Sequence, residues 1–156
     1  MAPMSDPVPD SHADRPRSRL KQGVLQAGEV VPSTLKQLDQ AVQACRRCPL
    51  WRHATQGVCG EGPKRASLMI VGEQPGDQED LAGRPFVGPA GRVLDAALEQ
   101  AGIDRGEVFV TNAVKHFKHE PRGSACRWWL EAERRLVKPR VIVAMGLICP
   151  RARRPW

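Results

Sequence analysis

Three short apolar segments alternate with helical patterns, and this alternation constrains the fold more than any other feature of the chain. The segments 67–72, 107–111 and 140–146 are rich in aliphatic residues. Continuous apolar runs of this kind are typical of strands buried on both faces of a parallel sheet. Segments 89–101 and 128–136 place apolar residues at helical spacing between these strands. Because crossovers of this kind are right-handed and cover the sheet, we expect an α/β protein, a three-layer α/β/α sandwich with a central parallel sheet.

The segments outside this alternation predict the domain boundaries. Residues 1–31 are rich in Pro, Ser, Asp and Arg without an apolar period, which predicts a disordered tail. Ser33 is expected to cap a helix that ends near Cys45. Residues 147–156 contain two prolines and a basic cluster, which predicts an irregular basic tail. We therefore expect one domain over residues 32–146, C-terminally truncated because its last strand lacks a covering helix.

The charge balance narrows the class of partner. Lys and Arg number 24 against 17 Asp and Glu, so the formal net charge is +7. Such an excess favours a polyanion partner, although many basic proteins are merely soluble. No apolar run approaches the ~18–20 residues of a membrane span, and the first residues lack the apolar stretch of a secretory signal. The composition therefore predicts a cytoplasmic monomer with no membrane partner.

Five cysteines occur in the chain, and their odd number in a reducing compartment argues against a disulfide framework. Cys45 and Cys48 form a Cys-x-x-Cys pair, a spacing used by zinc sites, redox pairs and iron–sulfur clusters. The absence of a second such pair weakens the zinc-ribbon alternative. Cys59 and Cys149 have no assigned role and are expected to be buried free thiols.

Two long loops should leave the carboxyl ends of the first two strands, where ligands bind in parallel sheets. They cover residues 73–88 and about 112–124. The first is a Gly-Pro-Gly-rich turn whose backbone N–H groups could approach a carbonyl or a phosphate. Glu73 and Asp77 add carboxylates that could stabilise a developing positive charge or orient a water. A phosphate loop or a solvated acidic loop is the alternative.

Two motifs carry a resemblance to a known family. The segment 72–91, GEQPGDQEDLAGRPFVGPAG, resembles the first active-site motif of the family 4 uracil-DNA glycosylases. The segment 111–118, TNAVKHFK, resembles the strand end that follows it in that family. Gln74 and the Lys-His-Phe-Lys run look closest to the UdgX branch, which traps its product covalently. The likeness covers about Cys45 to Gly146. It implies a DNA repair protein that recognises uracil flipped out of single- or double-stranded DNA and hydrolyses its N-glycosidic bond.

The resemblance also assigns roles within these motifs. It implies that Phe86 stacks on the flipped uracil, an interaction worth about 1–3 kcal/mol; an ordinary packing Phe is the alternative. The Asn112 amide offers donors and an acceptor that match the uracil edge and can reject cytosine; a turn-forming Asn is the alternative. The residues expected at the uracil are Gly72, Gln74, Gly76, Phe86 and Asn112. Those expected in catalysis are Glu73, Gln74 and Asp77.

A cofactor follows from the same resemblance. Family 4 enzymes use a Cys-x-x-Cys pair and two later ligands, at positions that are His116 and Cys126 in this sequence. The resemblance therefore implies a [4Fe–4S] cluster held by Cys45, Cys48, His116 and Cys126. His in place of Cys departs from the usual four-cysteine set, and imidazole would raise the cluster potential relative to thiolate. His119 is an alternative ligand. The cluster is expected to serve structure and DNA docking rather than electron transfer.

Basic residues in and after the second loop are candidates for phosphate contacts. The expected contacts are Lys115, Lys118 and Arg122, followed by Arg127, Arg134 and Arg135; a solvated basic face is the alternative. The UdgX loop with its trapping His is missing after Lys118, and no His occurs after His119. A second hypothesis is therefore a protein that binds uracil-containing or abasic DNA without turnover. A third is a metal-binding nucleotide-binding protein of unrelated role.

Overall fold

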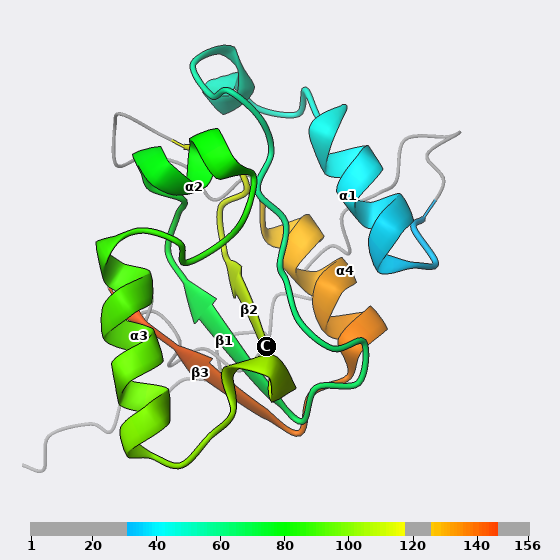
Figure 1. Ribbon diagram of the computed structural model, residues 1–156. Helices are drawn as coiled ribbons and strands as arrows, with labels where there is room; N and C mark the ends of the chain where they lie inside the picture. The colour runs from blue at the N-terminus through cyan, green and yellow to red at the C-terminus, as the bar shows by residue number, and fades with distance from the viewer. Residues whose placement is uncertain (1–30, 118–125, 147–156) are drawn as a thin grey trace, which may run out of the picture.

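The computed structural model describes residues 31–117 and 126–146. Within them, three parallel strands form one sheet in the order β2-β1-β3 (Figure 1). Their bounds are Leu68–Gly72 for β1, Val108–Asn112 for β2 and Val141–Ala144 for β3. In the register, Leu68 of β1 lies opposite Val108 on one side and Val141 on the other. The predicted parallel sheet is confirmed.

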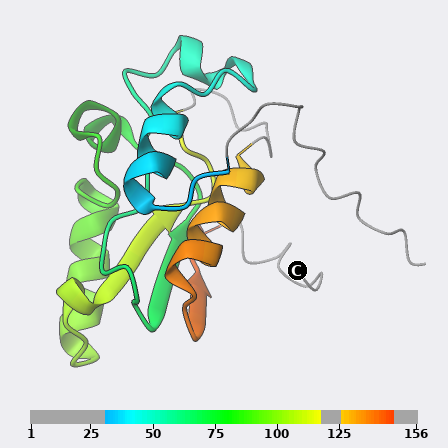
Figure 2. The ribbon, with the colours of Figure 1, turned by 90° about the vertical axis from the view of Figure 1, so that its right-hand side faces the viewer.

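Helices cover both faces of this sheet, as the alternation of elements predicted. Helices α1 and α4 lie side by side on one face, and α3 lies on the other (Figures 1 and 2). The helices are α1 (Leu35–Gln43), α2 (Asp77–Ala82), α3 (Pro89–Gln100) and α4 (Arg127–Val137), with two 3-10 turns, η1 (Pro49–Arg52) and η2 (Arg105–Glu107). The described residues thus form the expected three layers.

The apolar run of the central strand β1 is continuous because both of its faces are buried. Side chains alternate between the two faces of a strand, so Ile70 packs with Leu94 and Leu98 of α3. Met69 and Val71 pack with Val137 of α4 and with Phe109 of β2 on the opposite face. Burying each such side chain stabilises the fold by about 1.5–3 kcal/mol. A third cluster joins α1 to α4 and is built from Leu38, Val42, Cys45, Val114, Cys126, Trp129 and Ala132.

Two local expectations were wrong. The cap of α1 is Thr34 rather than Ser33, because Thr34 Oγ1 accepts the Gln37 backbone N–H at 3.2 Å. The Ser33 hydroxyl donates instead to the Gln37 side-chain oxygen at 2.8 Å. The segment 73–88 is not a loop throughout, since it contains α2. The acidic first turn of α2 favours a helix N-terminus electrostatically, and this outweighs the glycines around it.

The third strand departs from the expectation of burial on both faces. Val141, Ile142 and Val143 are 54%, 47% and 42% exposed. β3 lies at the sheet edge, and none of the described helices covers it.

The predicted tails 1–31 and 147–156 lie outside the described residues, apart from Val31. No helix in the part of the chain that the structure describes is long and apolar enough to span a bilayer.

Candidate functional site

Gly72, Phe86 and Asn112 converge at the carboxyl end of the sheet. Gly72 ends β1 and lies opposite Asn112, which ends β2. A Cβ atom built at position 72 would lie 2.7 Å from Phe86 Cζ and would collide with Asn112 Oδ1. The ring of Phe86 and the amide of Asn112 therefore approach the same glycine. The structure thus brings together three residues that the sequence assigned to uracil binding.

The amide of Asn112 is free to receive a ligand. Asn112 is 4% exposed, and no group in residues 31–117 or 126–146 hydrogen-bonds with its side chain. This side chain carries two N–H donors and one acceptor, and a bound base edge could form hydrogen bonds with them.

Phe86 adopts a backbone conformation that L-residues rarely take. Its φ is 58°, in the left-handed region, which costs about 1–2 kcal/mol for a residue with a side chain. Gly91 in the first turn of α3 permits this conformation, because the Phe86 carbonyl occupies the space that a side chain at position 91 would need. Strain of this kind is often retained at ligand sites.

The buried carboxylate of Glu79 joins Gly76 to Gly88, the two ends of the segment that carries Phe86. Its Oε2 accepts the Gly76 N–H at 3.0 Å and its Oε1 accepts the Gly88 N–H at 2.7 Å. Glu79 is only 7% exposed, so both hydrogen bonds are shielded from water. The sequence analysis did not assign Glu79 a role. Its position three residues after the N-cap Gly76 is a capping-box spacing and was the available signal.

The other predicted residues of the first motif differ in how deeply they are buried. The Oε1 atom of Gln74 is buried and has no hydrogen-bond partner among the described residues, as expected of a group that awaits a ligand. Glu73 is half-buried, and its carbonyl accepts the Val114 N–H at 3.0 Å. Asp77 is exposed at the first residue of α2. No described contact joins Asp77 to Asn112.

The predicted phosphate contact of Lys115 is wrong. Lys115 is 0% exposed, and its Nζ lies 2.7 Å from Glu133 Oε2 inside the domain. A lysine ammonium in the core is stable only when paired, and this one is held where no phosphate can reach it.

Arg134 and Arg135 pair with Glu131 on the exposed face of α4. Arg127 is exposed, so its phosphate contact stays a prediction. Lys118, His119, Arg122 and Cys149 lie outside the described residues.

Three of the four predicted cluster ligands are neighbours. Cys45 and Cys126 are buried in the cluster between α1 and α4, where Trp129 Nε1 donates to Cys45 Sγ at 3.3 Å. Burial raises the pKa of Cys126, and the nearby thiols of Cys48 and Cys45 raise it further. The helix packing thus gathers sulfur atoms from two distant parts of the chain.

His116, the fourth predicted ligand, is 3% exposed, and its Nδ1 has no partner among the described residues. Burial lowers its pKa, and the charge of Arg46 lowers it further. Neutral imidazole is the form that binds metals. No three His, Cys, Asp or Glu side chains in the described ranges are placed to hold one metal ion. In donor type, three thiols with one imidazole would suit an iron–sulfur cluster.

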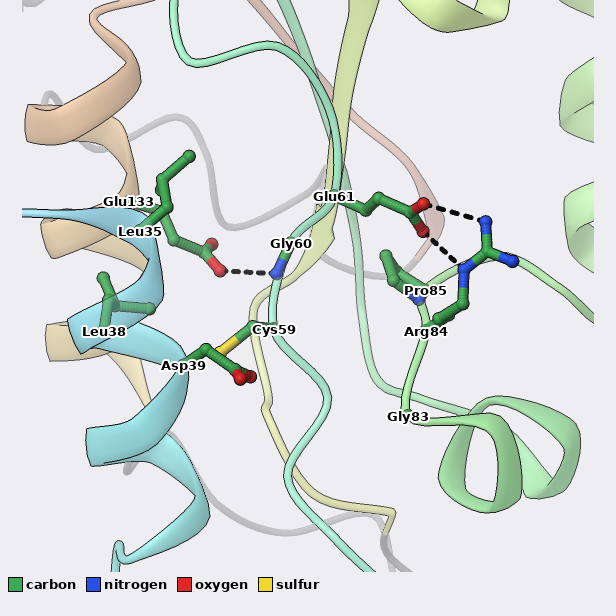
Figure 3. A pocket seen from close by; sticks show the side chains of 10 residues that line it. All are labelled: Leu35, Leu38, Asp39, Cys59, Gly60, Glu61, Gly83, Arg84, Pro85 and Glu133. Atoms are coloured by element: carbon green, nitrogen blue, oxygen red, sulfur yellow. Dashed lines mark hydrogen bonds and ion pairs between the residues drawn. The ribbon is translucent and has the colours of Figure 1, made fainter.

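Cys59 is a free thiol, as predicted, but it is half-buried. It lines a cavity of about 270 Å³ between α1 and the segment around Arg84 (Figure 3). Desolvation raises the pKa of this thiol far above its ordinary value. Such a thiol is unreactive at neutral pH, because only the thiolate is a good nucleophile.

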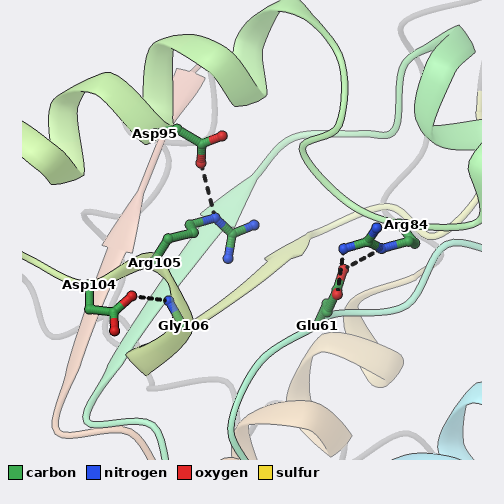
Figure 4. A network of polar contacts seen from close by, with 6 residues as sticks. All are labelled: Glu61, Arg84, Asp95, Asp104, Arg105 and Gly106. Atoms are coloured by element: carbon green, nitrogen blue, oxygen red, sulfur yellow. Dashed lines mark hydrogen bonds and ion pairs between the residues drawn. The ribbon is translucent and has the colours of Figure 1, made fainter.

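A second cavity, of about 520 Å³, lies beside Phe86. Two ion pairs border it (Figure 4): Arg84 binds both Glu61 carboxylate oxygens at 2.8 and 3.0 Å, and Arg105 Nε lies 3.2 Å from Asp95. Pairs this exposed contribute about 0–1 kcal/mol each to stability. They fix the outer wall of the cavity rather than supply free positive charge.

A surface of stacked arginines and tryptophans surrounds the Cys-x-x-Cys pair, and the sequence analysis did not identify it. The Arg46 guanidinium lies 4.4 Å from the Trp51 ring centroid, and Arg47 lies 4.6 Å from that of Trp128. Arg52 lies 5.7 Å from Trp51. All three arginines are exposed. The interleaving of basic residues with Trp51 in the sequence was the available signal. We call these five residues the Arg/Trp surface.

Hydrogen bonds fix the segment that follows the Arg/Trp surface against α2. The Asp80 carboxylate accepts the Thr55 N–H at 2.9 and 3.1 Å. The Gln56 side-chain amide donates to the Asp80 and Leu81 carbonyls, each at 3.0 Å. Because α2 belongs to the segment that carries Phe86, the Arg/Trp surface lies on the same end of the molecule as the converging residues.

Comparison with known proteins agrees with this geometry. Residues 59–152 match the sequence model of the family described as the uracil DNA glycosylase superfamily. The type-4 uracil-DNA glycosylase of Pyrobaculum aerophilum is 42% identical over 76% of this chain and 63% of its own length. Those of Sulfurisphaera tokodaii and Thermotoga maritima are 38% and 39% identical, over 72% and 70% of this chain and 54% and 60% of their own lengths.

The chain thus spans between about half and two thirds of the length of the curated relatives it matches. Membership of the UdgX branch stays a prediction. The match of the superfamily model over more than half of the chain, together with the parallel sheet that brings Gly72, Phe86 and Asn112 together, bears out the resemblance of the first motif. The chain belongs to the uracil DNA glycosylase superfamily, and its curated relatives are type-4 enzymes.

Proposed function

We propose that this protein recognises uracil flipped out of DNA and hydrolyses the bond between the base and deoxyribose. The observation that carries the proposal is the convergence of the Phe86 ring and the unpartnered Asn112 amide on Gly72. An extruded base loses its stacking partners, and an aromatic face offsets that loss. The relatives compared above are named as type-4 uracil-DNA glycosylases, which supports the same substrate for this chain.

Selectivity for uracil would come from the amides of Asn112 and Gln74. The Asn112 side chain can donate to a uracil carbonyl and accept from the neighbouring ring N–H. Cytosine presents an amino donor where uracil presents a carbonyl, so the same amide would face a mismatched group. The orphaned Oε1 of Gln74 supplies a second buried acceptor for a base N–H.

Cleavage breaks the bond between uracil N1 and C1′, and water supplies the hydroxyl group that adds to C1′. Positive charge develops on the sugar, and Glu73 or Asp77 would stabilise it or orient the water. Negative charge develops on the leaving uracil. The backbone N–H of Gln74 is the donor proposed for it in this turn, because Pro75 has no N–H and the Gly76 N–H donates to Glu79.

We also propose that Cys45, Cys48, His116 and Cys126 hold a [4Fe–4S] cluster. Support comes from the three neighbouring thiols and from the buried Nδ1 of His116, which has no partner among the described residues. A bound cluster would cross-link the α1 end, the β2 end and the start of α4, and it would add a rigid structural element beside the DNA site. His119 remains the alternative to His116.

The Arg/Trp surface is our proposed DNA contact, in place of Lys115. A guanidinium stacked on a Trp ring is held in a fixed plane, and it has five N–H donors, so one side chain can bind backbone and phosphate oxygens together. Arg46 Nη1 donates to the Gln43 and Cys45 carbonyls at 3.1 and 2.9 Å, which leaves its other N–H groups for a phosphate. Exposed Arg46 and Arg52 share Trp51 in this way. The net charge of +7 supports a polyanion partner. A cytoplasmic location and a monomeric state belong to the same proposal and rest on composition alone.

The test uses the full chain with labelled single- and double-stranded oligonucleotides that carry one uracil, and with matched thymine controls. We expect free uracil and an alkali-labile abasic site from the uracil strands alone. Tighter binding of uracil strands without release of uracil would support the hypothesis of binding without turnover. Equal binding of uracil and thymine strands, with no release, would overturn the proposal. A DNA adduct that survives denaturation would place the chain in the UdgX branch.

A further inference from the structure

The ammonium group of Lys115 is fully satisfied inside the domain. Its Nζ donates to Thr111 Oγ1 at 2.6 Å, to the Asn112 carbonyl at 2.7 Å and to Glu133 Oε2 at 2.7 Å. An ammonium group has three donors, and each finds one acceptor here. One of these acceptors belongs to the backbone of Asn112, the residue proposed to recognise the base.

The carboxylate of Glu133 completes the network from α4. Its Oε2 also accepts the Thr111 hydroxyl at 2.7 Å, and its Oε1 accepts the Gly60 N–H at 2.8 Å. The exposed fractions of the Lys115 and Glu133 side chains are 0% and 1%. The network therefore joins α4, the end of β2 and the segment at Gly60 through shielded hydrogen bonds.

Stability alone does not account for this pair. Two buried charges lose their hydration, and replacement of a buried ion pair by apolar residues is often neutral or stabilising. What apolar side chains cannot supply is a donor directed at the Asn112 carbonyl. Backbone bonds fix the next residues, since Ala113 N–H donates to the Gly72 carbonyl at 2.9 Å. The carbonyl of Asn112 itself is held by Lys115.

We propose that Lys115 and Glu133 are positioning residues that fix the Asn112 amide against the Phe86 ring and so determine selectivity for uracil. This inference rests on the proposed function. Recognition groups must be held within a fraction of an ångström, and a shift of about 1 Å can lower a rate on the order of a hundredfold. Asn112 is the last residue of β2, which lies at the edge of the described sheet and pairs with β1 on one side. The buried pair supplies the missing constraint.

The test is the double variant Lys115→Met, Glu133→Gln. Gln at position 133 keeps an oxygen for the Gly60 N–H and gains an amide donor for Thr111 Oγ1. Met fills the space of the lysine stem without charge, so the Asn112 carbonyl loses its donor and the Thr111 hydroxyl loses the acceptor for its proton. We expect a folded protein with uracil excision slower by at least about tenfold in kcat and a similar loss of discrimination against cytosine. KM should change little, because the proposed DNA contacts lie on the Arg/Trp surface and not at Lys115 or Glu133.

The matched control is Glu131→Gln, which removes the exposed ion pairs with Arg134 and Arg135 at 2.7 and 3.0 Å from the same helix. It should leave the rate and the discrimination unchanged. If the Lys115/Glu133 variant does not fold, Glu133→Asp takes its place. This variant retains both charges but draws the carboxylate back from Lys115, and we expect an intermediate loss of rate. A folded variant of either kind with the parental rate and discrimination would overturn the inference.

Hydrogen exchange separates this inference from the proposed function. In the double variant, the backbone amides of residues 111–115 should exchange faster than in the parent, while those of α3 should not change. If the parent releases no uracil and the exchange still rises, the proposed function fails and the positioning role stands. If exchange in residues 111–115 does not rise, the positioning role fails whatever the activity of the parent.

Discussion

The backbone carbonyl of Phe86 packs against Gly91, in the space that a Cβ atom at position 91 would occupy. This contact holds Phe86 at a φ of 58°, and it joins the aromatic residue of the candidate site to the first turn of α3. A glycine that looks like a poor helix residue in the sequence is therefore a requirement of the site.

Gly91→Ala should both destabilise the fold and displace Phe86. The added methyl group meets backbone atoms, which cannot move aside as a side chain would, so we expect a loss of about 1–3 kcal/mol in the free energy of unfolding. Urea denaturation measures it, and uracil release should fall in the same variant. Gly106→Ala is the control, because its nearest neighbour is the end of the exposed Asp104 side chain at 3.3 Å. Equal stability of the two variants would contradict the role of Gly91.

Asn112→Asp tests the amide as the group that recognises the base. The two side chains have nearly the same shape, but the carboxylate has no N–H donor and places negative charge against a uracil carbonyl. We expect uracil release to fall about 10²- to 10³-fold, measured in single turnover. The exposed Asp104→Asn variant should keep the parental rate. An Asn112→Asp protein that releases uracil at the parental rate would exclude the amide from recognition.

Phe86→Gly separates the ring from the backbone strain. Glycine adopts positive φ without steric strain, but the Phe86 ring also packs against the cluster of Ile70, Leu94 and Leu98, so the fold should lose some stability as the stacking face disappears. Loss of stacking should weaken binding of uracil-containing DNA by about 1–3 kcal/mol, measured by fluorescence anisotropy against a thymine strand. Leu81→Ala, at a side chain that is 72% exposed, should bind like the parent. Undiminished preference for uracil in Phe86→Gly would show that the ring does not stack.

The cluster proposal predicts a brown protein after anaerobic purification, with absorbance near about 400 nm from thiolate-bound iron. Cys126→Ala should lose both the iron and the colour, and iron removal should lower the melting temperature of the parent. His116→Cys should keep the colour with a lower reduction potential, because thiolate replaces imidazole. Cys59→Ala should be as brown as the parent. A colourless parent, or a brown Cys126→Ala protein, would contradict the ligand set.

The Arg/Trp surface predicts the salt dependence of DNA binding. Each phosphate contact contributes about 0.9 to the slope of log affinity against log salt on duplex DNA. Arg46→Gln with Arg52→Gln should therefore lower the slope by about 2 and weaken uracil and thymine strands alike. Lys64→Gln, an exposed residue away from the tryptophans, should leave it unchanged. A parental slope in the double variant would place the DNA elsewhere.

Much of this fold follows from local sequence. The apolar run before Gly72 and the helical spacing after Pro89 each report the burial of nearby residues, so strand, helix and parallel sheet could be predicted. The order of the motifs along the chain then put Phe86 and Asn112 at one end of the sheet. Errors arose where two local signals competed, as between Ser33 and Thr34 for the cap, or where helix-favouring acids follow glycines in α2.

The role of each charge was decided by tertiary structure. Lys115 looks like a surface lysine in a basic stretch, and the carboxylate that buries it comes from Glu133, 18 residues away. The same carboxylate holds Gly60, 73 residues away. The cost of a buried charge depends on partners that only the folded chain brings within hydrogen-bond distance. The sequence alone therefore determined the pattern of strands and helices and the motif, whereas packing decided which basic groups lie inside the domain and which lie on its surface.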